Sequence, residues 1–389
     1  MKNKIFHKLP KEALLLVELF LKANVKIYLV GGSVRDFYLN KIPNDFDFTT
    51  PALPEETCHI LKNYKLFKIG AKYGTIGVNI NGIYFEITTF RSESGYEDNR
   101  HPSNIIFKKD ILEDLKRRDF SINAIAYDIF EDRLIDEFNC LSDLKNGVIR
   151  CIGNPKDRFS EDSLRILRAF SFVSKLDFNI HNKTFQAVVE KKDLLKNIKI
   201  ERFRAEIIKI LNGINPKAAL KLIKNHNILD IKFIPKNLNK IPLNYRIYAL
   251  FLIFDNLDFI NKNLKNEIEI IRNIFNRFKY IRKIKDKRHF FAHLRVEFDI
   301  KYIFIALCIK IALNKKNIIF KKVFRAKTLN QKLSINGNDL LKAGFSRSKI
   351  RKVKNILSLH LYSKTLPNER RILLKYAKYK INGIVKSTI

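Results

Sequence analysis

The pattern of apolar residues changes once along this chain of 389 residues, after Gly153-Asn154-Pro155. Before this point, short strand-like runs alternate with turns and with a few helical stretches. After it, apolar residues recur every three or four positions, as at Leu164, Leu167 and Phe170, and recognisable strands disappear up to about residue 324. The sequence therefore predicts an α+β fold, with a mixed α/β head that contains one sheet and a remainder made of helices.

The head is expected to contain short strands connected by turns, with helices between some of them. The expected strands are Lys26–Val30, Phe46–Thr50, Leu66–Ile69, Thr75–Ile80, Ile83–Phe90, Ala124–Ile129 and Arg133–Phe138. The expected helices are Lys11–Ala23, Val34–Leu39 and Pro54–Asn63. Asn81-Gly82 is a strong signal for a tight hairpin between two of these strands.

The helical remainder contains several plausible breaks. Asn215-Pro216 and Ile234-Pro235 interrupt the helical pattern, and the glycines of the segment 333–345 suggest a turn between helices. We therefore predict a catalytic head over 1–153, a neck over 154–225, a body over 226–325 and a basic tail over 326–389.

Charge is distributed unevenly along the chain, whose net charge is +36. Residues 1–150 contain 22 basic and 21 acidic side chains, whereas residues 151–389 contain 53 and 18. An A/T-rich genome would also produce abundant Lys, Asn and Ile. Such a codon bias should raise the Lys content along the whole chain, so it does not explain why residues 1–150 are nearly neutral. The contrast indicates a near-neutral domain for chemistry joined to a part that binds a polyanion, and it favours nucleic acid over a membrane surface.

Several classes of protein are disfavoured by the same sequence. No stretch reaches the ~18–20 apolar residues that cross a bilayer, and the apolar run 13–17 ends at Glu18 without a small-residue cleavage site. The four cysteines are widely scattered, which fits neither a disulfide framework nor a metal cluster. We expect a soluble, cytoplasmic protein with no membrane partner.

The strongest local signal is a strand that ends at Gly31-Gly32, followed by a helix that carries Arg35. The missing side chains let backbone N–H groups approach a phosphate, and Arg35 can add a charge-assisted contact to a triphosphate. Downstream, Asp45 and Asp47 are two residues apart, so on a strand both carboxylates lie on one face. Two such carboxylates suit Mg²⁺, although a lone Gly-Gly is usually a turn and a lone Asp-x-Asp is usually a solvated strand edge.

Two further constellations combine arginines with carboxylates or amides. In the segment 117–124, Arg118, Asp119 and Asn123 could hold a triphosphate and a ribose hydroxyl, or could simply begin a surface helix. In the segment 161–168, Asp162, Arg165 and Arg168 recur every three residues and would lie near one face of a helix. Taken alone, this second pattern is better explained by an ordinary i,i+3 salt bridge.

The glycine and aspartate motifs, taken in this order, resemble the signature of DNA polymerase β-type nucleotidyltransferases. Further motifs in the same register make the chain similar to the family of class II tRNA nucleotidyltransferases (CCA-adding enzymes) and bacterial poly(A) polymerases. The motifs that carry this resemblance lie between about residues 27 and 211, at Leu29–Asp36 with Asp45–Asp47, Arg117–Ala124, Gly153–Phe159, Glu161–Arg165 and Glu201–Glu206. The C-terminal half matches only loosely, mainly through Ile335–Gly344.

The resemblance implies a polymerase β-type nucleotidyltransferase head, followed by a helical neck, body and tail, and it implies roles for individual residues. Asp45 and Asp47 would bind Mg²⁺ as catalytic residues, and Glu86, from a neighbouring strand, would assist them, although an exposed strand Glu is equally plausible. The remaining implied residues would bind the nucleotide: Gly31, Gly32, Arg35, Arg118, Asp119, Asn123, Asp162, Arg165 and Arg168.

Within this set, Asp162 and Arg165 would form a protein template for the incoming base. Ionised Asp is a pure acceptor and Arg a pure donor, whereas cytosine and adenine each present a ring-nitrogen acceptor and an exocyclic amino donor. One donor and one acceptor therefore select C and A against U and G, because a mispaired base leaves buried polar groups unsatisfied at roughly 1–3 kcal/mol each. The sequence departs from the family at Ser171, where an Arg is usual. This departure puts a phosphate or base contact in doubt, and Arg168 and Lys175 are candidates to compensate for it.

Two features favour CCA addition over poly(A) addition. The segment 69–76 resembles the CCA-type G-x-x-x-G-T pattern, and Thr89–Glu93 with Tyr96, Asp98, Arg100 and Pro102 resembles the flexible loop of enzymes that add the terminal A. The Ser-Glu-Ser-Gly composition of 92–95 also suggests a mobile loop. An A-only enzyme and a poly(A) polymerase remain alternatives, and a non-catalytic RNA-binding protein is a remote one.

The expected reaction is attack of a tRNA 3′-hydroxyl on the α-phosphate of CTP or ATP, with two metal ions and without a nucleic-acid template. The expected partners are thus the tRNA 3′ end, CTP and ATP, and no obligate protein partner is implied. Much of the grip on the tRNA backbone is expected from residues 301–389, which contain 22 basic and 2 acidic side chains.

Overall fold

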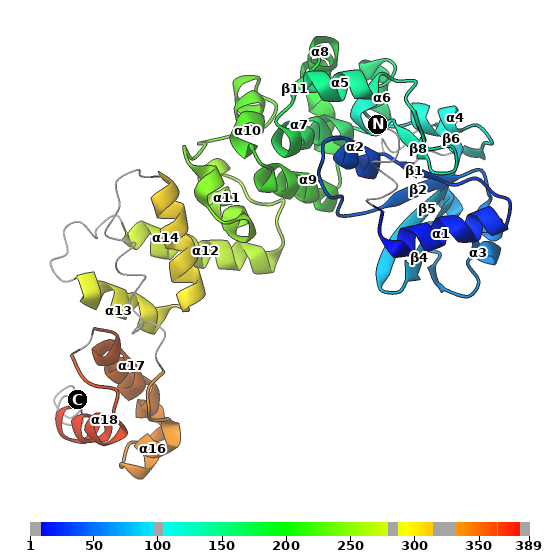
Figure 1. Ribbon diagram of the computed structural model, residues 1–389. Coiled ribbons are helices and arrows are strands. Elements are labelled where there is room, and N and C mark those ends of the chain that lie inside the picture. The colour runs from blue at the N-terminus through cyan, green and yellow to red at the C-terminus, as the bar shows by residue number, and fades with distance from the viewer. Residues whose placement is uncertain (1–8, 96–103, 279–286, 314–331, 364, 382–389) are drawn as a thin grey trace. The chain divides into compact units, whose positions relative to one another are not determined.

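The computed structural model describes residues 9–95, 104–278, 287–313, 332–363 and 365–381. It divides into two compact units, Met1–Leu229 and Asp230–Ile389, whose elements are labelled in Figure 1. The first unit contains the sheet together with helices, and the second is built from helices (Figure 1). The α+β fold predicted from the sequence is confirmed, while the finer boundaries at 153, 225 and 325 stay predictions.

The core of the first unit is a seven-stranded sheet with the order β3-β4-β5-β2-β1-β8-β9. Its strands are β1 (Tyr28–Val30), β2 (Asp47–Thr50), β3 (Lys65–Phe67), β4 (Thr75–Ile80), β5 (Ile83–Thr89), β8 (Ala126–Asp128) and β9 (Arg133–Ile135). Each of them overlaps one of the strands expected from the sequence. All neighbours in the sheet are antiparallel except β2 and β5, which run parallel.

Helices of the head surround this sheet: α1 (Lys11–Lys22), α2 (Gly32–Tyr38), α3 (Pro54–Ile60), α4 (Ile111–Lys116) and α5 (Cys140–Asn146). The buried side chains of α1 are Ala13, Leu16, Val17 and Phe20, whose spacing of three and four places them on one face. The short helix α2 follows β1 directly through Gly31, so the chain leaves the sheet and enters the helix without a loop.

Two hairpins extend from the head. Asn81 and Gly82 join β4 to β5 with positive φ angles of 49° and 91°, as a type I′ turn requires. A second hairpin pairs β6 (Arg91–Ser94) with β7 (Asn104–Phe107). The prediction of a mobile loop from residue 92 is thus wrong for its first residues, which are held by strand pairing, and Tyr96, Asp98, Arg100 and Pro102 lie outside the described residues.

Five helices complete the described part of the first unit: α6 (Pro155–Glu161), α7 (Leu164–Leu176), α8 (Asn182–Lys191), α9 (Ile200–Asn212) and α10 (Pro216–Asn225). The helix α7 packs against both α9 and α10. Strands do not stop completely after residue 153, because β11 (Asn179–Ile180) pairs in parallel with β10 (Val148–Ile149). Such two-residue strands are too short to produce an alternating pattern in the sequence.

The second unit is helical, as the sequence predicts. Its α-helices are α11 (Leu250–Ile253), α12 (Lys262–Arg277), α13 (Lys287–Glu297), α14 (Ile300–Leu313), α16 (Gly337–Lys342), α17 (Arg347–Ser363) and α18 (Arg370–Tyr376). The last three share a small core that includes Leu340, Leu357 and Leu373. Among the helices in the described ranges, none combines the length and the apolar character that spanning a membrane requires.

Candidate active site

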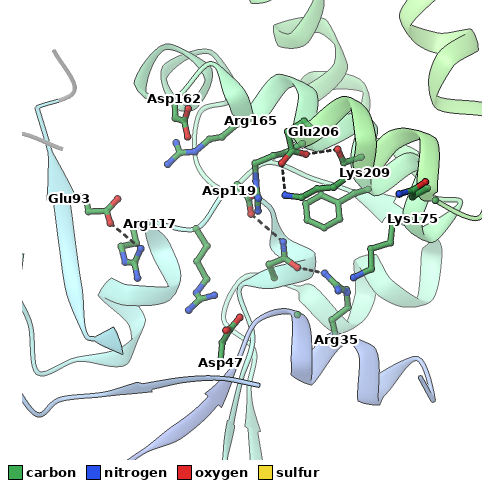
Figure 2. Close-up of a pocket in the computed structure, with 18 residues that line it drawn as sticks. Arg35, Asp47, Glu93, Arg117, Asp119, Asp162, Arg165, Lys175, Glu206 and Lys209 are labelled. Carbon is green, nitrogen blue, oxygen red and sulfur yellow. Dashed lines mark hydrogen bonds and ion pairs between the residues drawn. The ribbon is translucent and has the colours of Figure 1, made fainter. Parts of the chain in front are cut away.

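A cavity of about 670 Å³ lies in the first unit, where α2 and the ends of the head strands face α7 and α9. Charged side chains from all of these elements point into it (Figure 2). Nine of the residues predicted for the site line this cavity: Gly32, Arg35, Asp47, Arg118, Asp119, Asn123, Asp162, Arg165 and Arg168. Residues that are up to 136 positions apart in the chain are therefore gathered around one space.

Asp47 is the first residue of β2, and Glu86 lies beside it because these two residues are partners in the parallel register of β2 and β5. Desolvation raises the pKa of Asp47, the charge of Arg118 lowers it, and the charges of Glu86 and Asp45 raise it further. These three carboxylates are therefore close enough to repel one another, although Asp45 and Glu86 are not part of the cavity lining.

The structure corrects the prediction that Asp45 and Asp47 share one strand, because β2 begins only at Asp47. Ser33 in α2 accounts for this difference. Its Oγ donates to the carbonyl oxygen of Asp45 at 3.1 Å and accepts from the backbone N–H of Asp47 at 3.2 Å. The segment before the strand is thus held by a side chain of α2. Within the described part of the chain, no group of three or more His, Cys, Asp or Glu side chains is arranged to hold a metal ion.

The turn between β1 and α2 places the backbone of Gly31 next to the side chain of Arg118. Gly31 has a φ angle of 72°, and a Cβ atom there would lie 2.8 Å from Nη1 of Arg118. The guanidinium of Arg35 is buried, where it donates to Oδ1 of Asp36 at 2.8 Å and to Oδ1 of Asn123 at 2.6 Å. The missing side chain of Gly31 thus leaves space for Arg118, which comes from another segment. The sequence alone did not reveal this reason for a glycine.

Arg117 and Arg118 share the buried carboxylate of Asp114. Arg117 Nη2 lies 2.8 Å and Arg118 Nη2 lies 3.3 Å from its two oxygens. Burial opposes ionisation of Asp114, but the two guanidinium groups outweigh it and lower the pKa of this carboxyl. Arg117 also contacts Glu93 of β6 at 3.0 Å. Arg118 is therefore fixed at the cavity by a residue that none of the sequence motifs includes.

Asp119 and Asn123 belong to the same wall. The carboxylate of Asp119 accepts from Nε of Arg168 at 2.6 Å and from Nδ2 of Asn123 at 3.3 Å. Burial alone would raise the pKa of Asp119, but Arg168 reverses this effect and lowers it. Arg168 in turn lies over the ring of Phe172, 5.5 Å from its centroid. The predicted residues of the head and of α7 are thus joined directly.

Asp162 and Arg165 line the cavity, but the prediction that one helix carries both is wrong. The helix α6 ends at Glu161 and α7 begins at Leu164. Oδ1 of Asp162 accepts from the backbone N–H of Leu164 at 3.1 Å, a local bond that competes with helix continuation. Nη1 of Arg165 contacts Oε2 of Glu161 at 2.7 Å, so the expected i,i+3 pairing is replaced by an i,i+4 pair.

Further residues of the cavity lie on α7, on α9 or directly after α9 and were not predicted as site residues, among them Phe172, Glu206, Lys209, Asn212 and Gly213. Ser171 departs from the family pattern, and its Oγ donates to Oε2 of the buried Glu206 at 2.6 Å. Lys209 contacts the other oxygen of Glu206 at 2.7 Å. A signal for these residues existed in the helical spacing of 202, 206 and 209, which places them on one face of α9.

Comparison with known proteins agrees with these observations. Residues 27–150 match the family model described as the poly A polymerase head domain, and residues 177–238 match the probable RNA and SrmB-binding site of polymerase A. A CCA-adding enzyme from Lactobacillus helveticus is 47% identical over 194 residues, which cover 50% of this chain and 47% of the relative. Over these residues, the chain is similar to the tRNA nucleotidyltransferase and poly(A) polymerase family. The matched part thus spans about half the length of this curated relative.

Similarity of fold to solved structures extends over the whole length of the chain. The crystal structure of the Bacillus stearothermophilus CCA-adding enzyme in complex with CTP covers 100% of both chains with a TM-score of 0.76 and 24% identity. The Thermotoga maritima CCA-adding enzyme complexed with tRNA-CCA covers 97% of both with a TM-score of 0.70 and 22% identity. The predicted polymerase β-type head with a helical remainder is therefore confirmed as a fold.

Proposed function

We propose that this protein adds the 3′-terminal CCA to tRNA, using CTP and ATP and no nucleic-acid template. The observation that carries the proposal is that one cavity gathers the carboxylate of Asp47, the cationic side chains of Arg35 and Arg118, and the pair Asp162 and Arg165. The carboxylate supplies a centre for phosphoryl chemistry, and the two cationic side chains bind a triphosphate. The pair of Asp and Arg recognises a base. Similarity to CCA-adding enzymes supports the same assignment.

In the proposed reaction, the oxygen of the tRNA 3′-hydroxyl forms a bond to the α-phosphorus of CTP or ATP. The bond from that phosphorus to the bridging oxygen of the β-phosphate breaks, pyrophosphate leaves, and the hydroxyl proton is released. Arg35 and Arg118 bind the phosphates and balance negative charge that develops on the leaving group. Asp119 and Asn123 hold Arg168 and Arg35 in place, and we propose that they also contact the ribose.

We propose that a divalent cation, Mg²⁺, binds at this site; such an ion takes one or two carboxylates together with substrate phosphates, so it does not require a cluster of three. Asp45 and Asp47 would hold it, with Glu86 beside them. Asp45 and Glu86 raise the pKa of Asp47, and a cation would relieve this repulsion. When bound, the metal lowers the pKa of the attacking hydroxyl and neutralises charge on the phosphates.

Base selection is proposed to rest on Asp162 and Arg165. A carboxylate accepts from an exocyclic amino group and a guanidinium donates to a ring nitrogen, so the pair accommodates cytosine and adenine. Both side chains are held from outside the cavity, Asp162 by Arg202 and Arg165 by Glu161. Such support fixes their directions before a base arrives, which is what a protein template requires.

The test is extension of tRNA transcripts that end at the discriminator base or already carry CC, with Mg²⁺ and each nucleoside triphosphate separately and together. We expect addition of C, C and A, followed by a stop. Addition of A only to the CC-ended transcript would indicate an A-adding enzyme, and a long A ladder would indicate a poly(A) polymerase. Binding of RNA without any extension would overturn the enzymatic proposal and support a non-catalytic RNA-binding protein.

A further inference from the structure

The cavity extends beyond the predicted nucleotide residues, to a side where two lysines project from α7 and α9. Lys175 and Lys209 are both labelled in Figure 2, and both line the same space. Their side chains are about equally exposed, with relative accessibilities of 51% and 58%. The two lysines differ in the anions that surround them, and this difference carries the inference.

Lys209 has a carboxylate close at hand. Its Nζ lies 2.7 Å from Oε1 of Glu206, a buried carboxylate whose other oxygen accepts from Ser171. The charge of Glu206 also acts on Arg168, but Lys209 is the lysine in direct contact with it. The charge of Lys209 is therefore largely balanced within the protein, and little attraction remains for an additional anion.

Lys175 shares its anion with an arginine. Its Nζ lies 3.6 Å from Oδ2 of Asp36, whereas Nε and Nη2 of Arg35 lie 2.8 Å from Oδ1 of the same carboxylate. Burial lowers the pKa of Lys175 and the charge of Arg35 lowers it further. Two cations thus face one carboxylate at the wall of the cavity, which leaves positive charge for a ligand.

The position of Lys175 in the cavity matches the position expected for the terminal phosphate of a bound nucleotide. Arg35 is fixed by Asp36, by Asn123 and by the ring of Phe172, whose centroid lies 5.7 Å from its Cζ. Figure 2 shows Lys175 next to Arg35, on the side of the cavity away from Asp162 and Arg165. A triphosphate whose α-phosphate lies at Asp47 and whose base lies at Asp162 would extend past Arg35 toward Lys175.

We propose that Lys175 binds the terminal phosphate of the incoming nucleoside triphosphate, beyond the phosphates held by Arg35. This inference rests on the proposed function for the identity of the nucleotide, but only on charge and geometry for the binding of a polyphosphate. The ammonium group of a lysine is a compact charge on a flexible stem, which suits contact with a terminal phosphate. Lys175 lies outside the motifs of the sequence, where it is named only as a candidate to compensate for Ser171, and the charge around it gives it a specific role.

The experiment measures binding of CMP, CDP, CTP and inorganic tripolyphosphate by calorimetry, with full-length protein and the variants Lys175→Met and Lys209→Met. We expect Lys175→Met to weaken CTP and tripolyphosphate roughly three- to tenfold while leaving CMP unchanged, since one partly exposed charge–charge contact is lost. Lys209→Met should leave all four affinities within about twofold, and Lys175→Arg should restore the advantage of CTP over CDP.

An equal loss for CMP and CTP, or the same loss in both lysine variants, would overturn the inference. So would an unchanged advantage of CTP over CDP together with weaker tRNA binding, which would assign Lys175 to the RNA backbone. Thermal unfolding of each variant shows whether it is folded. If tripolyphosphate binding depends on Lys175 but the protein adds no nucleotide, this inference stands and the proposed function fails. If the protein adds CCA but tripolyphosphate binding does not depend on Lys175, the proposed function stands and this inference fails.

Discussion

Arg202 places two guanidinium nitrogens on the carboxylate of Asp162, with Nη1 3.2 Å from Oδ1 and Nη2 2.9 Å from Oδ2. The arginine belongs to α9 and the aspartate to the break between α6 and α7. A bidentate contact of this kind fixes the plane of the carboxylate as well as its position. An ionised carboxylate can still accept a further hydrogen bond from a base, so Arg202 orients Asp162 without blocking it.

The first prediction concerns this contact. Replacing Arg202 with Met should lower kcat/KM for CTP and ATP roughly ten- to hundredfold, since it removes a charge-assisted pair worth about 1.5–3 kcal/mol. It should also raise misincorporation from UTP, because Asp162 would no longer be held in one orientation. Single-nucleotide extension assays with all four triphosphates measure both effects. Arg204→Met, which removes the same charge from the same helix, is the control, and equal selectivity in the two variants would contradict the prediction.

The second prediction concerns the ionisation of Asp47. Its carboxyl has a raised pKa in the folded protein. As the pH falls, Asp47 therefore becomes protonated at a higher pH than an ordinary Asp and loses the ionised form that a cation needs. Titration of metal-free protein by NMR, followed at the Asp47 carboxyl carbon, measures this pKa. Glu86→Gln should lower it and Arg118→Met should raise it, because they remove charges of opposite sign. Burial is the main cause of the raised pKa, so shifts in the same direction would refute only the opposite contributions of Glu86 and Arg118.

The third prediction concerns Gly31. An added methyl group would meet Nη1 of Arg118 at 2.8 Å, and the φ angle of 72° disfavours any side chain. Gly31→Ala should therefore cost about 1–3 kcal/mol of stability and raise the KM for nucleotides. Gly82 is a matched control, because its φ angle is 91° but nothing lies within 4 Å of an added Cβ. Gly82→Ala should destabilise the fold by about 1–2 kcal/mol and leave KM unchanged, as urea unfolding and steady-state kinetics would show.

The fourth prediction concerns Ser171. Its Oγ donates to Glu206 in the contact between α7 and α9. Ser171→Ala should destabilise the protein by about 1–3 kcal/mol, because a buried carboxylate oxygen loses its donor. Ser160→Ala removes a hydroxyl that bonds only to the carbonyl of Lys156 on an exposed helix, and it should change stability by less than about 0.5 kcal/mol. Similar losses in urea unfolding for both variants would argue against a special role for the buried bond.

The sequence predicts the strands of the head well because their patterns are local. Thr75–Ile80, for example, is observed with the predicted bounds, and Asn81-Gly82 forms the turn that its residue types require. The hairpin of β6 and β7 was missed since Arg91–Ser94 is polar. Its pairing with Asn104–Phe107 depends on partners across a segment whose composition suggests a loop.

The sequence predicts the site residues that belong to motifs, but it does not predict the residues that hold them in place. Asp47, Arg118 and Arg165 reach one cavity as expected, because each belongs to a motif whose residue types indicate the chemistry. Asp114 and Glu206 are buried carboxylates whose roles depend on arginines, serines and lysines brought to them by the tertiary fold. The break at Asp162 was also hidden, since the bond of its side chain to Leu164 does not alter the hydrophobic pattern.

The parallel register of β2 and β5 has a consequence for refolding. Asp47 faces Glu86 only in that register, and a slip of one residue would put Phe85 or Ile87 opposite it. Because the two strands are joined through more than thirty intervening residues, this pairing cannot form as a simple hairpin. The fraction of chains that regain the proposed activity after denaturation therefore depends on how many have found the right strand alignment, and it can be lower than the fraction that regains secondary structure.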